Sequence, residues 1–150
     1  PLANAADQKD LNIMLHFPGS TCSEGDGGAL ESLVPTTRRA WLAEIPLPSQ
    51  IAYYSLVTYP HPDRISSVLK GTYKKLSQVD GRNDSQVIYY YQVIPGSTLL
   101  GFMNADHWAL AVPISRGHSL IGSTIVDKND YPREDLIEAV MRFLEEDLTR

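Results

Sequence analysis

The segment Ile51–Tyr59 constrains the fold of this chain more than any other. Its β-branched and aromatic residues lie between Pro48 and Pro60, a pattern that predicts a β-strand over residues 51–59. The segment is apolar almost without interruption, whereas a strand with one solvated face alternates apolar and polar residues. We therefore expect a parallel strand that is buried on both faces and covered by helices.

A second strand and a first helix are predicted on either side of this segment. Thr98–Met103 has a similar apolar character and predicts the second strand. A helix is expected over 36–45, because Thr36 or Thr37 can cap its start and Pro46 ends it. The two predicted strands are thus separated by a long connection, as parallel strands require.

The remaining segments complete an alternation of helices and strands. Residues 64–79 show a weak helical period, and Val87–Ile94 fits a strand or a helix equally well. An amphipathic helix is predicted after Pro132, with acidic residues in its first turn. Its apolar stripe consists of Leu136, Ile137, Val140, Met141, Leu144 and Leu148. The order helix, strand, helix, strand, helix predicts an α/β fold with a mainly parallel sheet and right-handed crossovers.

Length, charge and hydropathy narrow the classes of function. With 150 residues, the chain is long enough for one domain with its own core. Its formal net charge of -5, without a cluster of Lys or Arg residues, argues against nucleic-acid binding. No apolar stretch reaches the roughly 20 residues of a transmembrane helix. The sequence begins at Pro1 without a signal-peptide pattern, which favours a cytoplasmic location and a processed product or a fragment.

The sequence contains no pattern for a metal or a cofactor. Cys22 is the single cysteine, so an internal disulfide and an all-cysteine metal site are excluded. The histidines stand at positions 16, 61, 107 and 118, without the close spacing of metal ligands. The glycines of segment 25–28 lack the Lys-Ser/Thr of a phosphate-binding loop. We expect neither a bound metal nor a cofactor.

A histidine and a carboxylate follow the predicted strands. His107 comes after Thr98–Met103 and a short stretch of small and polar residues, which is the placement of a catalytic base on a loop. Asp84 lies earlier, in a turn-rich segment, and Asp63 is the alternative acid. Asp106 is expected to point away from His107. The competing interpretation is a structural, hydrogen-bonded histidine and an ordinary turn at Asp84.

From about residue 30 onward, the sequence resembles the C-terminal half of a bacterial α/β-hydrolase. Segment 83–87, Asn-Asp-Ser-Gln-Val, is similar to the turn that holds the triad acid of that family. Segment 95–108, which ends in Asn-Ala-Asp-His-Trp, is similar to the one that holds the triad histidine. The resemblance implies a serine esterase or lipase-like site with Asp84 as the acid and His107 as the base. Ser85 stands where the family has glycine.

The serine nucleophile of that family is not recognisable in this chain. The Gly-x-Ser-x-Gly elbow does not occur, and neither Ser20 nor Cys22 has the small residues two positions away that a tight elbow needs. We expect 1–29 to be a flexible segment with a Gly-rich loop and 30–150 to be the hydrolase-like portion. The isolated chain is then inactive. The alternative is a non-enzymatic binding or scaffolding domain in which His107 is structural.

The predicted sheet also implies a partner. Two or three strands are few for a sheet, which usually has about 4–6. A strand that is apolar on both faces leaves an open edge and an uncovered face when its neighbours are absent. We therefore expect the edge of strand 51–59 to associate with a missing N-terminal half or with a second copy of the chain, and an ester-type small molecule to be the substrate.

Overall fold

The computed structural model describes residues 28–111 and 131–149. The expected N-terminal segment, with Ser20 and Cys22, falls outside the described residues apart from its last two positions. The described elements are α2 (Gly28–Leu33), α3 (Pro35–Glu44), β1 (Tyr54–Thr58), α4 (Lys70–Ser77), β2 (Thr98–Met103), α5 (His107–Ala111) and α8 (Arg133–Leu148). Three short 3-10 helices lie between β1 and β2 at Pro62–Arg64, Ser67–Leu69 and Tyr89–Tyr91.

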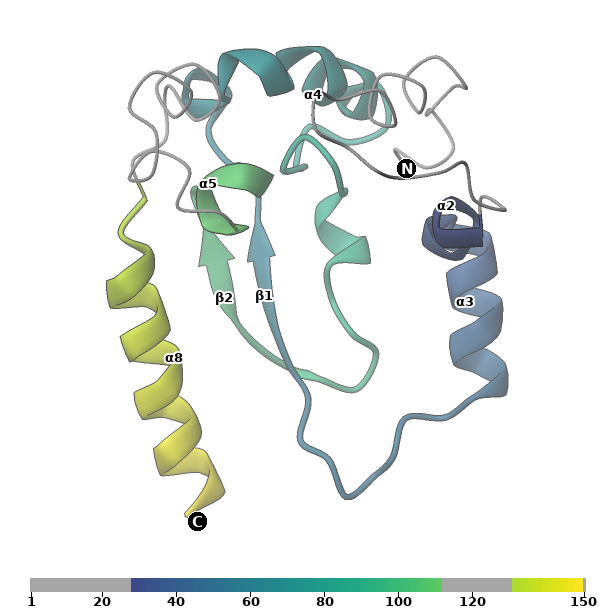
Figure 1. Ribbon diagram of the computed structural model, residues 1–150, viewed down its shortest axis with the longest axis vertical. Coiled ribbons are helices and arrows are strands. Elements are labelled where there is room, and N and C mark those ends of the chain that lie inside the picture. Colours follow the sequence, from purple (N-terminus) through teal and green to yellow (C-terminus); the bar gives the residue numbers. More distant parts are fainter. Residues whose placement is uncertain (1–27, 112–130, 150) are drawn as a thin grey trace, which may run out of the picture.

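Strands β1 and β2 form the parallel pair that the sequence predicts. Tyr54 lies opposite Thr98 and Thr58 opposite Met103, with one irregularity after Ser55. Both strands point toward the end of the molecule where α4 and α5 lie (Figure 1). The segments after the two strands therefore meet at this end. Within the described residues the sheet has two strands with flanking helices, which is a partial α/β fold.

The strand predicted over 51–59 is shorter than expected. It begins at Tyr54 because its partner begins only at Thr98, after a turn that the Ser97 N–H closes onto the Ile94 carbonyl over 3.0 Å. Val57 is fully buried, but Leu56 is only partly buried. The expectation of a strand buried on both faces along its length is thus wrong for the described residues.

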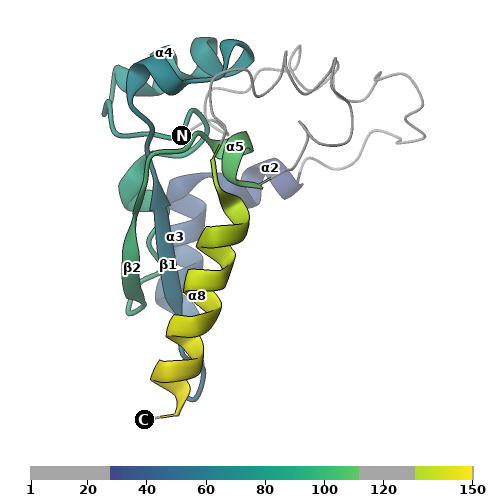
Figure 2. The ribbon, with the colours of Figure 1, turned by 90° about the vertical axis from the view of Figure 1, so that its left-hand side faces the viewer.

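Helix α8 lies along one face of the strands and runs back in the opposite direction (Figures 1 and 2). Tyr54 joins β1 to this helix twice. Its ring meets the edge of the Phe143 ring, with centroids 6.0 Å apart, and its hydroxyl donates to Asp147 Oδ2 over 2.7 Å. Leu136 packs nearer the start of α8, against a buried cluster formed by Met103, Ala105 and Ala109.

The apolar stripe predicted for the last helix is only partly used. Leu136 packs on the buried cluster, whereas Ile137, Met141 and Leu148 are 61%, 60% and 69% exposed. Helix α3 carries no buried residue, and Figure 1 shows it standing apart from both strands. Helix α8 has no buried residue, so the described helices cover one face of the small sheet only in part and leave other apolar surface exposed.

The connection between the strands differs from the expected pattern. The helical period over 64–79 becomes two 3-10 turns followed by α4, so that Ile65 is buried while Val68 is 51% exposed. Segment 87–94 is neither a strand nor an α-helix. It buries Ile88, which forms an isolated bridge with Asn83, and then makes a single 3-10 turn.

Candidate active site

The turn around Asp84 holds a buried carboxylate in one orientation. Asp84 Oδ1 accepts the backbone N–H groups of Gln86 over 2.9 Å and Val87 over 2.7 Å. The Asp84 N–H donates to the Val87 carbonyl over 3.1 Å, which closes the turn. We call residues 83–87 the acid turn. Because Oδ1 is occupied by two backbone donors, Oδ2 is left to face other groups.

The acid turn requires a left-handed backbone at Ser85, whose φ is 82°. Glycine adopts this conformation without a steric penalty, and serine does not. The Ser85 N–H is satisfied by Asn83 Oδ1 over 3.0 Å, but its buried hydroxyl has no hydrogen-bond partner. Ser85, the residue that departs from the turn which this segment resembles, therefore lies at the strained position.

His107 is the first residue of α5, and the preceding aspartate anchors that helix. Asp106 Oδ1 accepts the Ala109 N–H over 2.8 Å, which caps the helix start. Its Oδ2 accepts the backbone N–H of Ser66 over 2.9 Å and also the Ser66 hydroxyl. Asp106 thus points to the segment after β1 and away from the His107 ring, as expected. Its bonds fix where the helix begins, and so where the imidazole stands.

The structure brings Asp84 and His107 together. His107 Nδ1 lies 2.8 Å from Asp84 Oδ2, and the His107 backbone N–H donates to the Asp84 carbonyl over 3.0 Å. Since an ionised carboxylate only accepts hydrogen bonds, Nδ1 carries the proton and Nε2 remains available to accept one. Thr58 Oγ1 donates to the same Oδ2 over 3.1 Å. The geometry is that of a histidine oriented by a carboxylate.

The electrostatics of the pair favour the charged imidazole. The hydrogen bond to Asp84 is the largest effect and raises the pKa of His107 above its ordinary value of 6.5. Partial burial of the ring opposes the rise, while the negative charges of Asp84 and Asp106 add to it. His107 is therefore prepared to hold a proton that a reacting group gives up.

The alternative acid, Asp63, belongs to a different pair. Its Oδ1 lies 2.5 Å from His61 Nδ1, and both side chains are largely exposed. The hydrogen bond from His61 lowers the pKa of Asp63. The structure thus joins His107 to Asp84 and leaves Asp63 with His61.

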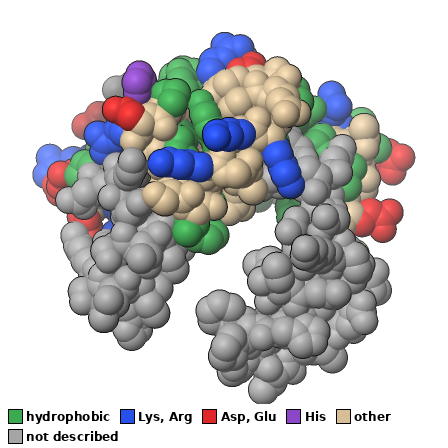
Figure 3. All heavy atoms as spheres, turned by 90° about the horizontal axis from the view of Figure 1, so that it is seen from above, with side chains coloured by type: hydrophobic (Ala, Val, Ile, Leu, Met, Phe, Trp, Pro, Cys, Tyr) green, Lys and Arg blue, Asp and Glu red, His purple; other side chains and the backbone are tan. Residues whose placement is uncertain are grey.

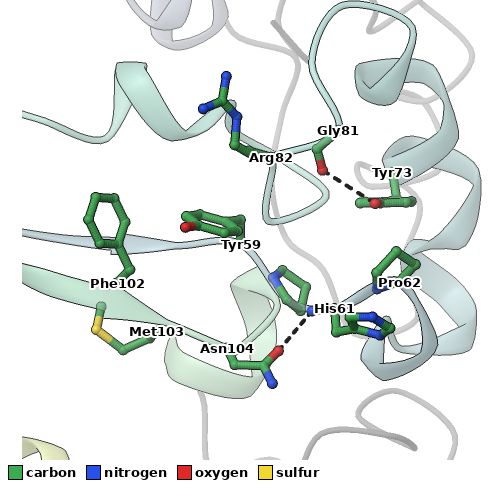
Figure 4. A pocket seen from close by; sticks show the side chains of 10 residues that line it. Tyr59, His61, Pro62, Tyr73, Gly81, Arg82, Phe102, Met103 and Asn104 are labelled. Atoms are coloured by element: carbon green, nitrogen blue, oxygen red, sulfur yellow. Dashed lines mark hydrogen bonds between the residues drawn. The ribbon is translucent and has the colours of Figure 1, made fainter.

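An open cavity of about 620 Å³ lies at the same end of the sheet (Figure 4). Tyr59 and Phe102 form an aromatic wall, with ring centroids 5.6 Å apart. His61 and Asn104 stand across from them, joined by the His61 N–H to Asn104 Oδ1 bond of 2.8 Å. The cavity is mainly apolar. It is lined by the end of β2, the segments after the two strands, α4 and the residues just before the acid turn, but not by Asp84 or His107 themselves.

Among the described residues, this end of the molecule carries several exposed positive side chains, although the formal net charge of the chain is -5. Figure 3, seen from this end, shows Lys and Arg side chains spread over the surface, and α4 contributes the exposed Lys70, Lys74 and Lys75. The acidic residues 145–147 lie at the far end of α8. Among the described residues, the α4 lysines and these acidic residues therefore lie at opposite ends.

Within residues 28–111 and 131–149, no group of three His, Cys, Asp or Glu side chains is placed to hold a metal ion. No helix in the same described ranges has the length and apolarity of a membrane span.

Sequence reasoning missed three side chains around the pair, namely Thr58, Ser66 and Gln92. Thr58 and Ser66 hold Asp84 and Asp106 through their hydroxyl groups. The side-chain amide of Gln92 forms hydrogen bonds with the backbone N–H and C=O of Thr58. Hydroxyl and amide side chains that bond across a fold leave no periodic signal in a sequence. A polar residue at the end of an apolar strand, such as Thr58, is the one hint that was present.

The chain matches no protein-family model and no curated protein. Among solved structures it is similar to the crystal structure of the metagenomic carboxyl esterase MGS0156, with 42% sequence identity and a TM-score of 0.86. The match covers 98% of this chain and 44% of that chain, so this chain spans less than half the length of the esterase it matches. The resemblance to a partial hydrolase-like fold is thereby confirmed at this coarser level.

Proposed function

We propose that this chain supplies the acid and the base of a serine esterase or lipase-like hydrolase of the α/β-hydrolase type. The observation that carries the proposal is the 2.8 Å contact between His107 Nδ1 and Asp84 Oδ2, at the carboxyl end of a parallel strand pair. A carboxyl esterase that matches 98% of the chain supports the same chemistry. The nucleophile elbow lies outside this chain in this proposal, because the chain contains no Gly-x-Ser-x-Gly.

The proposed reaction is acyl transfer from an ester to water. His107 Nε2 takes the proton of a serine hydroxyl as the serine attacks the ester carbonyl, and the imidazolium returns that proton to the leaving alcohol. Asp84 holds the ring in the tautomer with the proton on Nδ1 and stabilises the imidazolium. A water molecule then releases the acid in the same manner.

The substrate proposed is a small-molecule carboxylic ester. The cavity beside Tyr59 and Phe102 is apolar enough to receive the hydrocarbon part of such an ester, as ligand pockets generally are. The lysines of α4 make the surroundings favourable for the carboxylate product.

The partner proposed for this chain is the nucleophile-bearing half, or a second copy that uses the same edge. Strand β1 pairs with β2 on one edge, and no described strand pairs with its other edge. Exposed strand edges of this kind recruit another chain, here at the positions before Thr58, whose own N–H and C=O are bonded to Gln92. The exposed Leu99 and Phe102 of β2 add apolar surface to the small sheet.

Labelling with a serine-directed phosphonate tests the proposed function. In the longer protein that contains this chain, we expect covalent labelling and ester hydrolysis, both lost on changing His107→Gln. Asp84→Asn is expected to lower turnover by about 10⁴-fold, because the histidine adopts the wrong tautomer. Asp63→Asn is the matched control, since Asp63 pairs with His61, and it is expected to keep full activity.

The alternative function is a non-enzymatic binding or scaffolding domain that uses His107 structurally. The same labelling experiment separates the two. A scaffold has no activated hydroxyl, so the probe would not label the wild-type protein, and the His107→Gln variant would differ from it in stability alone.

A further inference from the structure

The side chain of Gln92 lies between the end of β1 and the acid turn. Its Oε1 accepts the backbone N–H of Thr58 over 2.6 Å, and its Nε2 donates to the Thr58 carbonyl over 2.8 Å. The same Nε2 donates to the Val87 carbonyl over 3.2 Å. A single primary amide therefore contacts two segments that are far apart in the sequence.

The two bonds to Thr58 occupy the edge of β1 that faces away from β2. The next residue, Tyr59, donates its N–H to the Met103 carbonyl of β2 over 3.1 Å. Successive residues of a strand direct their backbone groups to opposite edges, so Thr58 presents its own N–H and C=O to the outer edge. The Gln92 amide takes the place that the peptide group of a neighbouring strand would have there.

Thr58 and Val87 are also two of the residues that hold the Asp84 carboxylate. Thr58 Oγ1 donates to Oδ2 over 3.1 Å, and the Val87 N–H donates to Oδ1 over 2.7 Å. The Thr58 hydroxyl lies 3.2 Å from Gln92 Oε1 as well, so its hydrogen has two acceptors within reach. Gln92 thus connects the donor on one side of the carboxylate to the donor on the other side.

We propose that Gln92 is a positioning residue for the His107–Asp84 pair. Its hydrogen bonds go to Thr58 and Val87 and not to either side chain of the pair. It holds Thr58 and Val87 at a fixed separation, which keeps Asp84 Oδ2 directed at His107 Nδ1. A rotation of the carboxylate by a few tens of degrees would break the 2.8 Å contact, because the hydrogen bond weakens steeply as it bends. We call the hydrogen bonds of Gln92 to Thr58 and Val87 the clamp. Its role in catalysis rests on the proposed function, but its effect on the geometry of the pair does not.

The test is the titration of the His107 ring, followed by NMR in the chain as it stands. Gln92→Met keeps the approximate volume of the side chain and removes the four hydrogen bonds of its amide. We expect it to lower the pKa of His107 toward the ordinary imidazole value, because the carboxylate no longer faces Nδ1 steadily. Gln78→Met is the matched control, since Gln78 is exposed at the end of α4, and it is expected to leave the His107 titration unchanged.

A merely structural role for Gln92 predicts a different result. The variant would then be less stable, and its Thr58 amide would exchange faster, while the His107 pKa stayed at the wild-type value. That outcome overturns the proposal. Should Gln92→Met fail to fold, hydrogen exchange of the wild-type chain replaces it. The Thr58 and Val87 amides are expected to open together with one free energy, and independent opening contradicts the clamp.

The two proposals fail separately. A lowered His107 pKa in Gln92→Met, in a longer protein that hydrolyses no ester, supports the clamp and overturns the hydrolase function. An unchanged His107 pKa in a protein that does hydrolyse esters overturns the clamp alone.

Discussion

Ser85 combines two unfavourable features at the most constrained point of the acid turn. Its φ of 82° is a conformation that costs a non-glycine residue roughly 1–3 kcal/mol, and its buried hydroxyl lacks a partner. The turn is stable because Asp84 Oδ1 and Asn83 Oδ1 together accept hydrogen bonds from three backbone N–H groups. The local strain is thus offset by the bonds that orient Asp84.

Ser85→Gly is therefore expected to raise the free energy of unfolding by about 1 kcal/mol. Glycine removes the strain and the unpaired hydroxyl, and the larger entropy of glycine in the unfolded chain reduces the gain. Urea denaturation measures the change. Ser49→Gly, in an exposed turn without a positive φ, is the control and is expected to lose stability. A Ser85→Gly variant that loses as much as Ser49→Gly would show that the turn is not strained.

His107 gives the folded chain a pH dependence whose sign comes from its raised pKa. The folded state binds the proton more tightly than the unfolded state, so the contribution to stability is fully present below the unfolded pKa of about 6.5. It is lost as the pH rises through the raised pKa of the folded state. The difference in unfolding free energy between the wild-type chain and His107→Gln is thus expected to shrink with rising pH.

Urea denaturation at a series of pH values from about 5 to 9 covers this window. Gln78→Met, at an exposed side chain that does not titrate, reports any general effect of pH on stability. A difference for His107→Gln that grows with pH would mean that Asp84 does not stabilise the imidazolium.

At the scale of elements, β2 could be predicted residue for residue, while β1 could not. The start of β2 at Thr98 follows from the local sequence, since the turn at Gly96–Ser97 comes directly before it. The length of β1 depends on where its partner begins, which no property of segment 51–59 encodes. The prediction of a strand or a helix over segment 87–94 was wrong for a related reason. Its apolar residues are used singly, with Ile88 buried, rather than along one face.

Helix α8 offers a matched pair of residues for testing which part of its apolar stripe is used. Leu136 packs against the buried cluster, and its neighbour Ile137 is 61% exposed. Leu136→Ala is expected to lower the free energy of unfolding by about 2 kcal/mol, and Ile137→Ala by less than about 0.5 kcal/mol. Thermal denaturation of both variants measures the difference. An equal or larger loss for Ile137→Ala would indicate that a second chain covers the exposed half of the stripe.

At the scale of the molecule, the sequence contained enough to predict the meeting of Asp84 and His107. Both come after strands, and a parallel strand pair brings the segments beyond its carboxyl ends to one end of the sheet. The sequence did not contain enough to predict Gln92 and Ser66, because their partners are backbone groups or residues distant in the chain. The catalytic roles of the pair stay a prediction until ester hydrolysis is measured.

The chain alone is expected to associate and to remain inactive. Light scattering on the purified chain should show self-association, because the outer edge of β1 has no described strand beside it. A nitrophenyl ester should be hydrolysed no faster than background, since a base without a positioned hydroxyl and oxyanion hole lacks the covalent step. A stable monomer would contradict the first expectation. Turnover that disappears in Cys22→Ala would contradict the second.

The pairing of β1 with β2 has a kinetic consequence. Every contact between Tyr54–Thr58 and Thr98–Met103 joins residues separated by the whole intervening connection, and a nucleus built on them must first close that loop. The acid turn is local and can form early, but we expect His107 to reach its final place only once the strands have aligned, because His107 follows β2 and Thr58 of β1 also holds Asp84. Assembly of the pair should therefore be among the last events of folding, so that the His107 ring signal reports completion rather than collapse.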